Sequence, residues 1–225
     1  MAQMKTPGVY IIEKNAFPNS VVEVATAIPA FIGHTQFARD GNKDLTGIPF
    51  RISSMAEFHS FFGFAPTLRF GIRPEDSESE DTTNDINVLF PDGSCQLTLP
   101  KTFYALYYNM LLFYANGGGP CYIVSVGDYE HDFKSIDFTN ALLALKKEQE
   151  PTLVVVPEAV YMEEGDCYKV QTAALMHCGN DMKNRFAILD VFNGYKDENG
   201  AVIKSFRENI GSNFLAYCAS YYPWI

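Results

Sequence analysis

Residues 103–126 read Phe103-Tyr-Ala-Leu-Tyr-Tyr-Asn-Met-Leu-Leu-Phe-Tyr-Ala115, then Asn116-Gly-Gly-Gly-Pro120, then Cys121-Tyr-Ile-Val-Ser-Val126. The first segment is apolar almost all the way round, which predicts a helix buried on most sides. Asn116 and Gly117 suit the left-handed turn that ends a helix, and Pro120 blocks its continuation. The last segment predicts a buried strand. Helix, glycine turn and strand make half of an α/β unit.

The chain after residue 126 repeats this pattern. A helix capped by Asp137 is predicted at 138–150, a second helix at 168–184, and buried strands at 152–157 and 186–191. Two strand–helix–strand connections in succession predict parallel pairing. A capping box at Ser205 predicts a short helix, and residues 214–225 predict a last strand. The expected fold class is α/β with some α+β character: a mixed sheet with parallel core strands flanked by helices.

The N-terminal 20 residues predict an extended arm rather than a core element. Its one short strand comprises Val9, Tyr10, Ile11 and Ile12. A lone strand is not stable by itself, so it must pair with a sheet edge of its own subunit or of a neighbour.

One domain is expected over residues 21–225. It begins with strands at 21–25 and 30–33 and a helix that a capping box opens at Ser54 and Gly63 ends. Residues 73–92 form an insertion that starts with many acidic residues, and a solvated loop is expected there.

Composition restricts the classes of function. The net charge of −10 over 225 residues argues against a nucleic-acid partner, because phosphate contacts need clustered Lys and Arg. The five cysteines are odd in number and scattered, which indicates free thiols and a reducing compartment. The N-terminus lacks a signal-peptide core, and the longest apolar stretch, 104–115, is too short to span a bilayer. We expect a chain made in the cytoplasm, with no direct membrane insertion.

Several motifs resemble ligand sites, but no metal or cofactor is expected at any of them. The glycine turn at 116–120 follows a helix and precedes a strand, the opposite polarity to a phosphate loop. The acidic insertion lacks the order of ligands that a calcium loop needs. His177 and Cys178 resemble a nucleophile pair, but neighbours on a helix point about 100° apart. The remaining histidines, His34, His59 and His131, show no metal-ligand spacing.

Asp190 ends the third buried strand, where α/β enzymes place catalytic carboxylates. A site at the C-terminal strand ends, near Pro157 and Asp190, is therefore the enzyme hypothesis. The competing interpretation is that Asp190 orders the next loop through Arg185, since no partner acid, base or nucleophile motif accompanies it.

Taken together, the segments of this chain resemble the contractile tail sheath family of phage tails and phage-like contractile injection systems. The similar segments follow the family's order along nearly the whole chain: Thr6–Tyr10, Val24–Gly33, Ser54–Gly63, Phe113–Val126, Leu153–Pro157, His177–Asp190 and Ala219–Trp224.

The resemblance implies a structural protein and no enzyme. Sheath subunits stack as six-fold rings around an inner tube, between baseplate and cap proteins, and contract to drive the tube through a target membrane. The arm strand of this family exchanges between subunits, so the resemblance assigns Val9–Ile12 to a neighbour's sheet. It also implies assembly in a bacterial cytoplasm, into a phage tail or an injection particle.

One departure from the family concerns residues that would follow the last predicted strand. Family members continue past Tyr221-Tyr-Pro-Trp224 into a C-terminal domain that grips the tube, and this chain lacks it. A fragment and a shortened paralogue both fit. The alternative function is a cytoplasmic α/β enzyme with its site near Pro157 and Asp190.

Overall fold

The computed structural model describes residues 27–68, 70–74, 85–90, 93–98, 102–196 and 199–222. The predicted arm strand Val9–Ile12 and the predicted strand at 21–25 lie outside these residues. So do residues 75–84, which hold most of the acidic run of the insertion.

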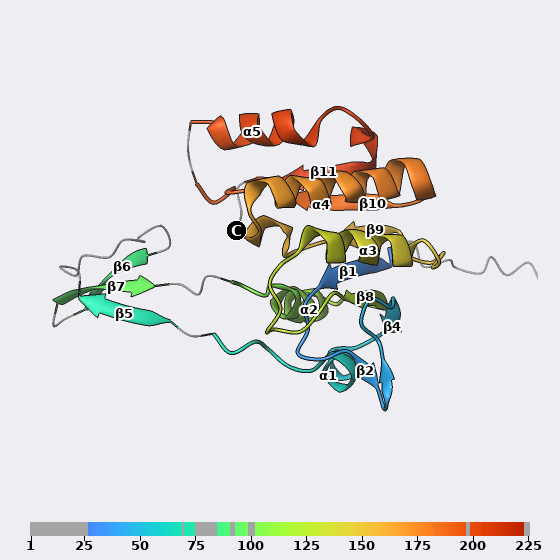
Figure 1. The fold of residues 1–225 in the computed structure, drawn as a ribbon, viewed down its shortest axis with the longest axis horizontal. Coiled ribbons are helices and arrows are strands. Elements are labelled where there is room, and N and C mark those ends of the chain that lie inside the picture. The colour runs from blue at the N-terminus through green and yellow to red at the C-terminus, as the bar shows by residue number, and fades with distance from the viewer. Residues whose placement is uncertain are drawn as a thin grey trace, which may run out of the picture.

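A six-stranded mixed sheet forms the centre of the molecule (Figure 1). Its strands are β1 (Pro29–Gly33), β4 (Phe50–Ile52), β8 (Cys121–Ser125), β9 (Leu153–Val155), β10 (Phe186–Asp190) and β11 (Cys218–Tyr221). They lie in the order β11-β10-β9-β1-β8-β4. All neighbours pair in parallel except β4, which runs antiparallel to β8. The α/β class with parallel core strands is therefore confirmed.

Helices flank this sheet on both faces. They are α1 (Met55–Phe62), α2 (Leu106–Ala115), α3 (Ser135–Leu145), α4 (Glu164–Met176) and α5 (Ala201–Ile210). Short helical turns lie at η1 (Ala159–Tyr161), η2 (His177–Met182, a π-helix) and η3 (Leu215–Tyr217), and a small hairpin joins β2 (Arg39–Asp40) to β3 (Lys43–Asp44). Figure 1 shows α3 and α4 side by side, with α5 beyond them.

The two faces of the sheet build separate hydrophobic cores. Ala30 and Ile32 of β1 pack with buried residues of α3 and α4, whereas Phe31 between them packs with α1 and α2. Side chains alternate between the faces of a strand, so one strand serves both cores. Every residue of β1 and β8 is buried, which explains their mostly apolar sequences.

Several predicted elements are confirmed. Ser54 caps α1 by accepting a hydrogen bond from the Glu57 N–H, and Gly63 ends that helix at φ 86°. Phe58 and Phe62 of α1 are fully buried. The segment that begins at residue 103 does give a helix, a glycine turn and a buried strand, although the helix begins at Leu106.

Other expectations were wrong in detail. Helix α2 is not buried on most sides, because Leu112 is 66% exposed on its outer face. Helix α3 begins at Ser135, ahead of Asp137, and ends at Leu145. The Ser205 capping box is not a helix start, since α5 already begins after Gly200, which takes the left-handed conformation. Residues 214–225 are not one strand: η3 precedes the four-residue strand β11.

The insertion also differs from the expected loop. Strands β5 (Gly71–Pro74), β6 (Asp85–Phe90) and β7 (Gly93–Thr98) form an antiparallel sheet in the order β5-β7-β6. Figure 1 shows this sheet standing apart from the body on two linkers. The acidic run lowers the average hydropathy of the insertion and masked the alternating apolar residues beside it.

Candidate functional site

The strand order identifies where a ligand site would be expected. Taken alone, the five parallel strands follow the doubly wound order 2-1-3-4-5, with β1 and β9 at the point where the winding reverses. Domains of this type bind ligands in the crevice beyond the carboxyl ends of those two strands. His34 directly follows β1, and Glu158 follows β9 by three residues. We refer to His34, Glu158 and the residues that contact them as the switch-point cluster.

Glu158 is the centre of this cluster and is completely buried. Its Oε2 accepts hydrogen bonds from the His34 backbone N–H (2.9 Å) and from His34 Nδ1 (2.8 Å). Its Oε1 accepts one from the Leu106 N–H at the start of α2 (3.2 Å). Three donors therefore compensate a carboxylate that burial would otherwise strongly destabilise. The carboxylate ties β1, η1 and α2 together.

The space around the His34 ring is filled by aromatic side chains. Tyr104, Phe133 and Phe138 lie with ring centroids 5.0–5.7 Å from the imidazole. A Cβ added at Gly33 would lie 2.9 Å from the Leu106 Cβ and 3.0 Å from the Glu158 carboxyl carbon. The crevice at this point is thus closed by packing, and glycine is needed at residue 33 for the close approach.

A second pair of hydrogen bonds continues the cluster toward β8. The Thr35 hydroxyl lies 2.7 Å from the Ser125 hydroxyl, and the Thr35 N–H donates to the Gly127 carbonyl at 3.0 Å. Thr35 and Ser125 are both buried. The ends of β1, β8 and β9 are therefore fixed to one another by polar contacts that no bulk water reaches.

The candidate nucleophile pair, His177 and Cys178, lies in surroundings that suit packing rather than catalysis. His177 and Cys178 are both buried where α4 passes into η2. Burial raises the pKa of the Cys178 thiol to about 12, so it is a poor nucleophile at neutral pH. Burial, helped by the Arg185 charge, lowers the pKa of His177 to about 4.

The Arg185 side chain does not pair with Asp190, which corrects that part of the interpretation. Its Nη1 donates to His177 Nε2 and to the Leu145 carbonyl, each at 2.9 Å, and its Nη2 donates to the Glu148 carbonyl. The guanidinium thus binds carbonyls at the C-terminal end of α3, where a positive charge is favourable.

Asp190 lies at the carboxyl end of β10 as the enzyme hypothesis requires. Burial raises the pKa of its carboxyl group. Its backbone carbonyl accepts a hydrogen bond from Gln171 Nε2 at 2.7 Å. Burial and, secondarily, the Asp190 charge raise the pKa of the nearby Cys167 thiol to about 12. An ionised thiol beside Asp190 is therefore strongly disfavoured.

The remaining candidates give no cluster of metal ligands. Within the described ranges, no group of three or more His, Cys, Asp and Glu side chains could hold a metal ion. His59 stacks on Phe64 and Tyr107, and His131 lies 2.6 Å from Asp128. The glycine turn follows the carbonyl end of α2, as its sequence polarity predicted.

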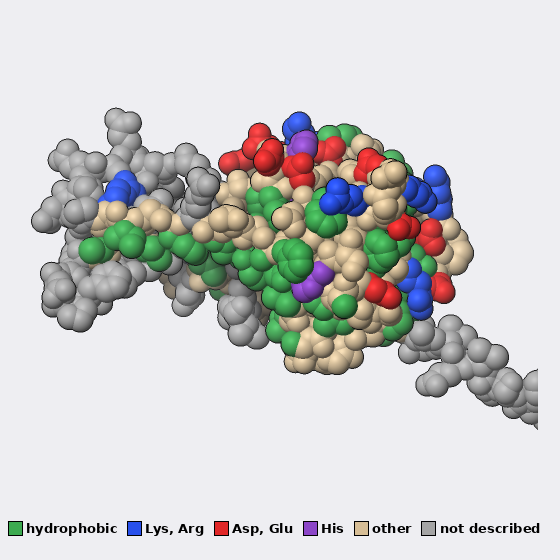
Figure 2. Space-filling view, turned by 90° about the horizontal axis from the view of Figure 1, so that it is seen from below, with side chains coloured by type: hydrophobic (Ala, Val, Ile, Leu, Met, Phe, Trp, Pro, Cys, Tyr) green, Lys and Arg blue, Asp and Glu red, His purple; other side chains and the backbone are tan. Residues whose placement is uncertain are grey.

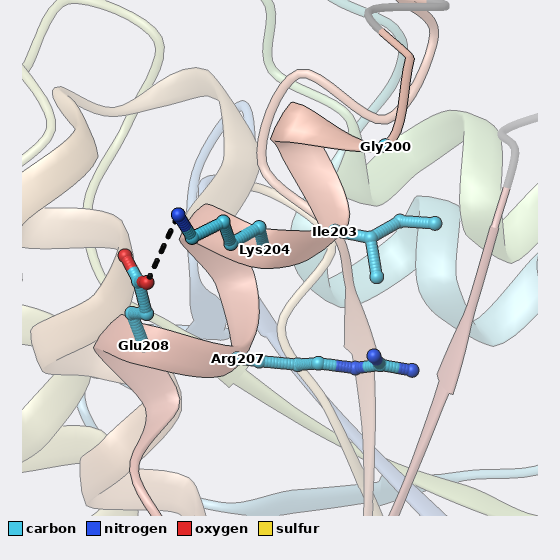
Figure 3. A pocket seen from close by; sticks show the side chains of 5 residues that line it. All are labelled: Gly200, Ile203, Lys204, Arg207 and Glu208. Atoms are coloured by element: carbon cyan, nitrogen blue, oxygen red, sulfur yellow. Dashed lines mark ion pairs between the residues drawn. The ribbon is translucent and has the colours of Figure 1, made fainter.

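One open groove lies along α5 and is shown in Figure 3. Ile203 and Arg207 point to one side of the helix, while Lys204 and Glu208 form an exposed ion pair on another (3.8 Å). The pair is more than half exposed at both side chains, so it adds little stability. The groove brings together no acid, base and nucleophile.

Comparisons with known proteins do not identify the chain. No known protein-family profile matches it, and a search of characterised proteins finds no significant match. Its function must therefore be argued from its own residues.

Sequence reasoning missed the switch-point cluster. His34 shows no metal-ligand spacing in the sequence, and Glu158 belongs to no motif beside Pro157. The two residues are 124 positions apart, so no local motif joins them. The available signal was that each polar residue closely follows an apolar strand, at the ends of strands expected to be parallel.

Proposed function

We propose that this chain is a structural subunit of a contractile sheath, which stacks as six-fold rings around an inner tube and contracts to drive the tube through a membrane. The observation that carries the proposal is the closed switch point. Glu158, His34 and Leu106 fill the place where a domain of this topology would hold a small molecule. Such packing suits a domain that moves as a rigid body, as a sheath subunit does during contraction.

The proposal is supported by the resemblance of the sequence segments and by an open sheet edge. β11 is the last strand of the described sheet, with β10 on its inner side. Its outer edge carries backbone groups that an added strand could pair with. The arm residues 9–12 of a neighbouring subunit are the proposed source of such a strand.

Strand exchange is tested by comparing two proline substitutions. Ile11→Pro removes a backbone N–H inside the proposed arm strand, whereas Gln3→Pro alters the arm outside it. Sedimentation velocity and negative-stain microscopy should show rings or filaments for the unmodified chain and for Gln3→Pro. Ile11→Pro should give monomers of about 25.2 kDa, and deletion of residues 1–19 should give correspondingly smaller monomers. Assembly that survives both changes would contradict strand exchange.

The competing function is an α/β enzyme with its site near Pro157 and Asp190. One observation favours it: burial raises the pKa of Asp190, as it does for many general acids. Thermal unfolding with a panel of mononucleotides, sugar phosphates and amino acids separates the two functions. A rise in Tm that disappears in Asp190→Asn would support the enzyme, whereas an unchanged Tm throughout is expected for the sheath subunit.

A further inference from the structure

Helix α2 carries exposed apolar side chains and no charge. Its ten residues, Leu106–Ala115, include no Asp, Glu, Lys, Arg or His. Leu112 is 66% exposed, and Leu111 is 41% exposed. A surface helix ordinarily places charged or polar residues opposite its buried stripe. Figure 2 shows the side of the molecule that holds α1 and α2, where hydrophobic side chains lie in the middle of the body and charged ones gather toward its upper and right-hand margins. An apolar helix surface of this kind is expected to be covered by another segment.

A groove lies beside these leucines, at the C-terminal end of α2. It is bounded by α2, by the glycine turn that follows this helix and by the segment that leads into β1. The space over the turn is open, because a Cβ added at Gly117 or at Gly119 would meet no atom within 4 Å. Among the described residues that line the groove, none is charged. These residues are Ala27, Phe31, Asn109, Leu112, Phe113 and 116–119.

Ala27 connects this groove to the N-terminal segment of the chain. It is the first residue that the structure describes, and it lines the groove, so the peptide bond to Thr26 begins at the groove itself. Six residues of extended chain, 21–26, reach up to about 20 Å. The ten residues of α2 span about 15 Å. The segment is therefore long enough to lie along the groove and across Leu112.

The central sheet offers residues 21–26 no further strand pairing among the described strands. β1 lies between β8 and β9, so both of its edges are already occupied. Pro120 directly precedes β8 and Pro151 lies two residues before β9, and neither proline has an N–H to donate. The Ile28 N–H already donates to the Thr152 hydroxyl (3.1 Å) instead of to a strand carbonyl. Pairing along β1 therefore ends near Ile28, and the sheet does not account for the valines ahead of it.

We propose that residues 21–26 of the same chain dock into the α2 groove, with their valine side chains against Leu112 and Phe113. Three of these six residues are valines, and Glu23 is the one that carries a charge. Valine is favoured in extended chain and its side chain gains from burial, whereas Glu23 can remain in water. The apolar segment and the uncharged groove therefore match in chemistry. The valines are Val21, Val22 and Val24.

The covalent link at Ala27 favours the chain's own segment over any other occupant. A segment joined to its site by a short linker has an effective concentration that is roughly millimolar. The same segment of a neighbouring copy would have to reach a similar free concentration to compete. Docking also fixes the point at which residues 1–20 leave the body. The inference concerns one copy of the chain, so it does not rest on the proposed sheath function.

Thiol labelling of the full chain compares two exposed leucines. Leu112→Cys places a thiol in the groove, and Leu143→Cys places one on α3, where the leucine is 56% exposed. With the groove open, both thiols should react with a maleimide at similar rates. The docked segment should slow labelling of Leu112→Cys about tenfold or more, since the thiol reacts only in the fraction of molecules with the segment undocked. Asn116→Cys, which keeps the apolar lining, should be slowed in the same way. Peptide mass spectrometry separates these thiols from the native cysteines.

A matched pair of triple substitutions tests the identity of the occupant. Serine at each of the three valines of 21–26 should raise the labelling rate of Leu112→Cys to that of Leu143→Cys. Serine at three apolar residues of the arm should leave Leu112→Cys slow. Buried Cys121 should stay unlabelled in every variant, which checks that the body remains folded. The arm residues are Val9, Ile11 and Ile12.

Three results would overturn the proposal. The first is equal labelling of Leu112→Cys and Leu143→Cys in the otherwise unmodified chain, because the groove would then be open. The second is slow labelling of Leu112→Cys that the valine substitutions leave unchanged. The third is protection of Leu112→Cys that disappears on dilution, because the groove would then be filled by the segment of a neighbouring copy.

Discussion

The switch-point cluster and the projecting sheet differ in how far their side chains are covered by the rest of the chain. At the switch point, a buried carboxylate receives three hydrogen bonds, and aromatic rings fill the space around its histidine partner. In the projecting sheet, the central strand β7 pairs with both of its neighbours, while Ile72 of β5 remains exposed. The body is therefore packed as a folded unit, whereas the projection leaves the Ile72 side chain uncovered by the described residues. Substitutions in the buried body should therefore lower stability more than substitutions in the projection.

The largest effect is expected from removal of the Glu158 carboxylate. Glu158→Ala leaves His34 and the Leu106 N–H without their buried acceptor. Loss of one partner of a buried pair typically lowers the free energy of unfolding by about 3–5 kcal/mol. Urea denaturation measures it, with Glu208→Gln on exposed α5 as a control expected to change it by less than about 0.5 kcal/mol. Equal effects of the two substitutions would contradict a special role for the switch point.

The next effect is a dependence of stability on pH that His177 introduces. Its pKa is about 4 in the folded chain and 6.5 without burial, so the unfolded chain binds a proton first as pH falls. The stability is fully present above pH 6.5 and is lost toward pH 4, by about 3 kcal/mol at most. His177→Gln, whose amide oxygen can still accept from Arg185, should lack this loss. Denaturation at pH 7, 5.5 and 4 measures the difference, and parallel curves for both proteins would contradict it.

A smaller effect should come from filling the close approach at Gly33. Gly33→Ala forces its Cβ against Leu106 and Glu158 and should lower the free energy of unfolding by about 1–3 kcal/mol. Gly119→Ala is the matched control, because no atom lies within 4 Å of the Cβ it would add. Thermal unfolding of both variants should show a lower Tm only for Gly33→Ala. An equally lowered Tm for both variants would contradict a close approach of Gly33 to Leu106 and Glu158 as the cause.

The smallest effect on stability is expected in the projecting sheet. Ile72→Thr keeps a β-branched residue and should change the free energy of unfolding by less than about 0.5 kcal/mol, since the side chain is largely exposed. A stability loss as large as that of Gly33→Ala would show that the Ile72 side chain packs within its own chain.

The sequence alone predicts those features of the fold that depend on residues close together in the chain. The helix cap at Ser54, the turn after α2 and the buried strands β8, β9 and β10 each follow from short runs of residues. The start of α5 could not be predicted in this way, because the Ser205 capping motif lies within a helix that begins after Gly200. The exposure of Leu112 depends on which face of α2 meets the sheet, which the helix sequence does not determine.

The switch-point cluster and the strands of the insertion escaped prediction for a different reason. Glu158 meets His34 only because β9 lies beside β1, a neighbour relation that the order of elements along the chain does not specify. The pairing of β5 with β7, and of β6 with β7, is likewise a long-range choice. Parallel pairing of the core strands was predictable, but the order of the strands was not.

The most direct test of the proposed sheath function is negative-stain electron microscopy of particles from the source, labelled with an antibody against this chain. Label is expected along the length of striated tubes in long and short forms. Recovery of the chain only as a small oligomer, with no labelled particles, would contradict the proposed function.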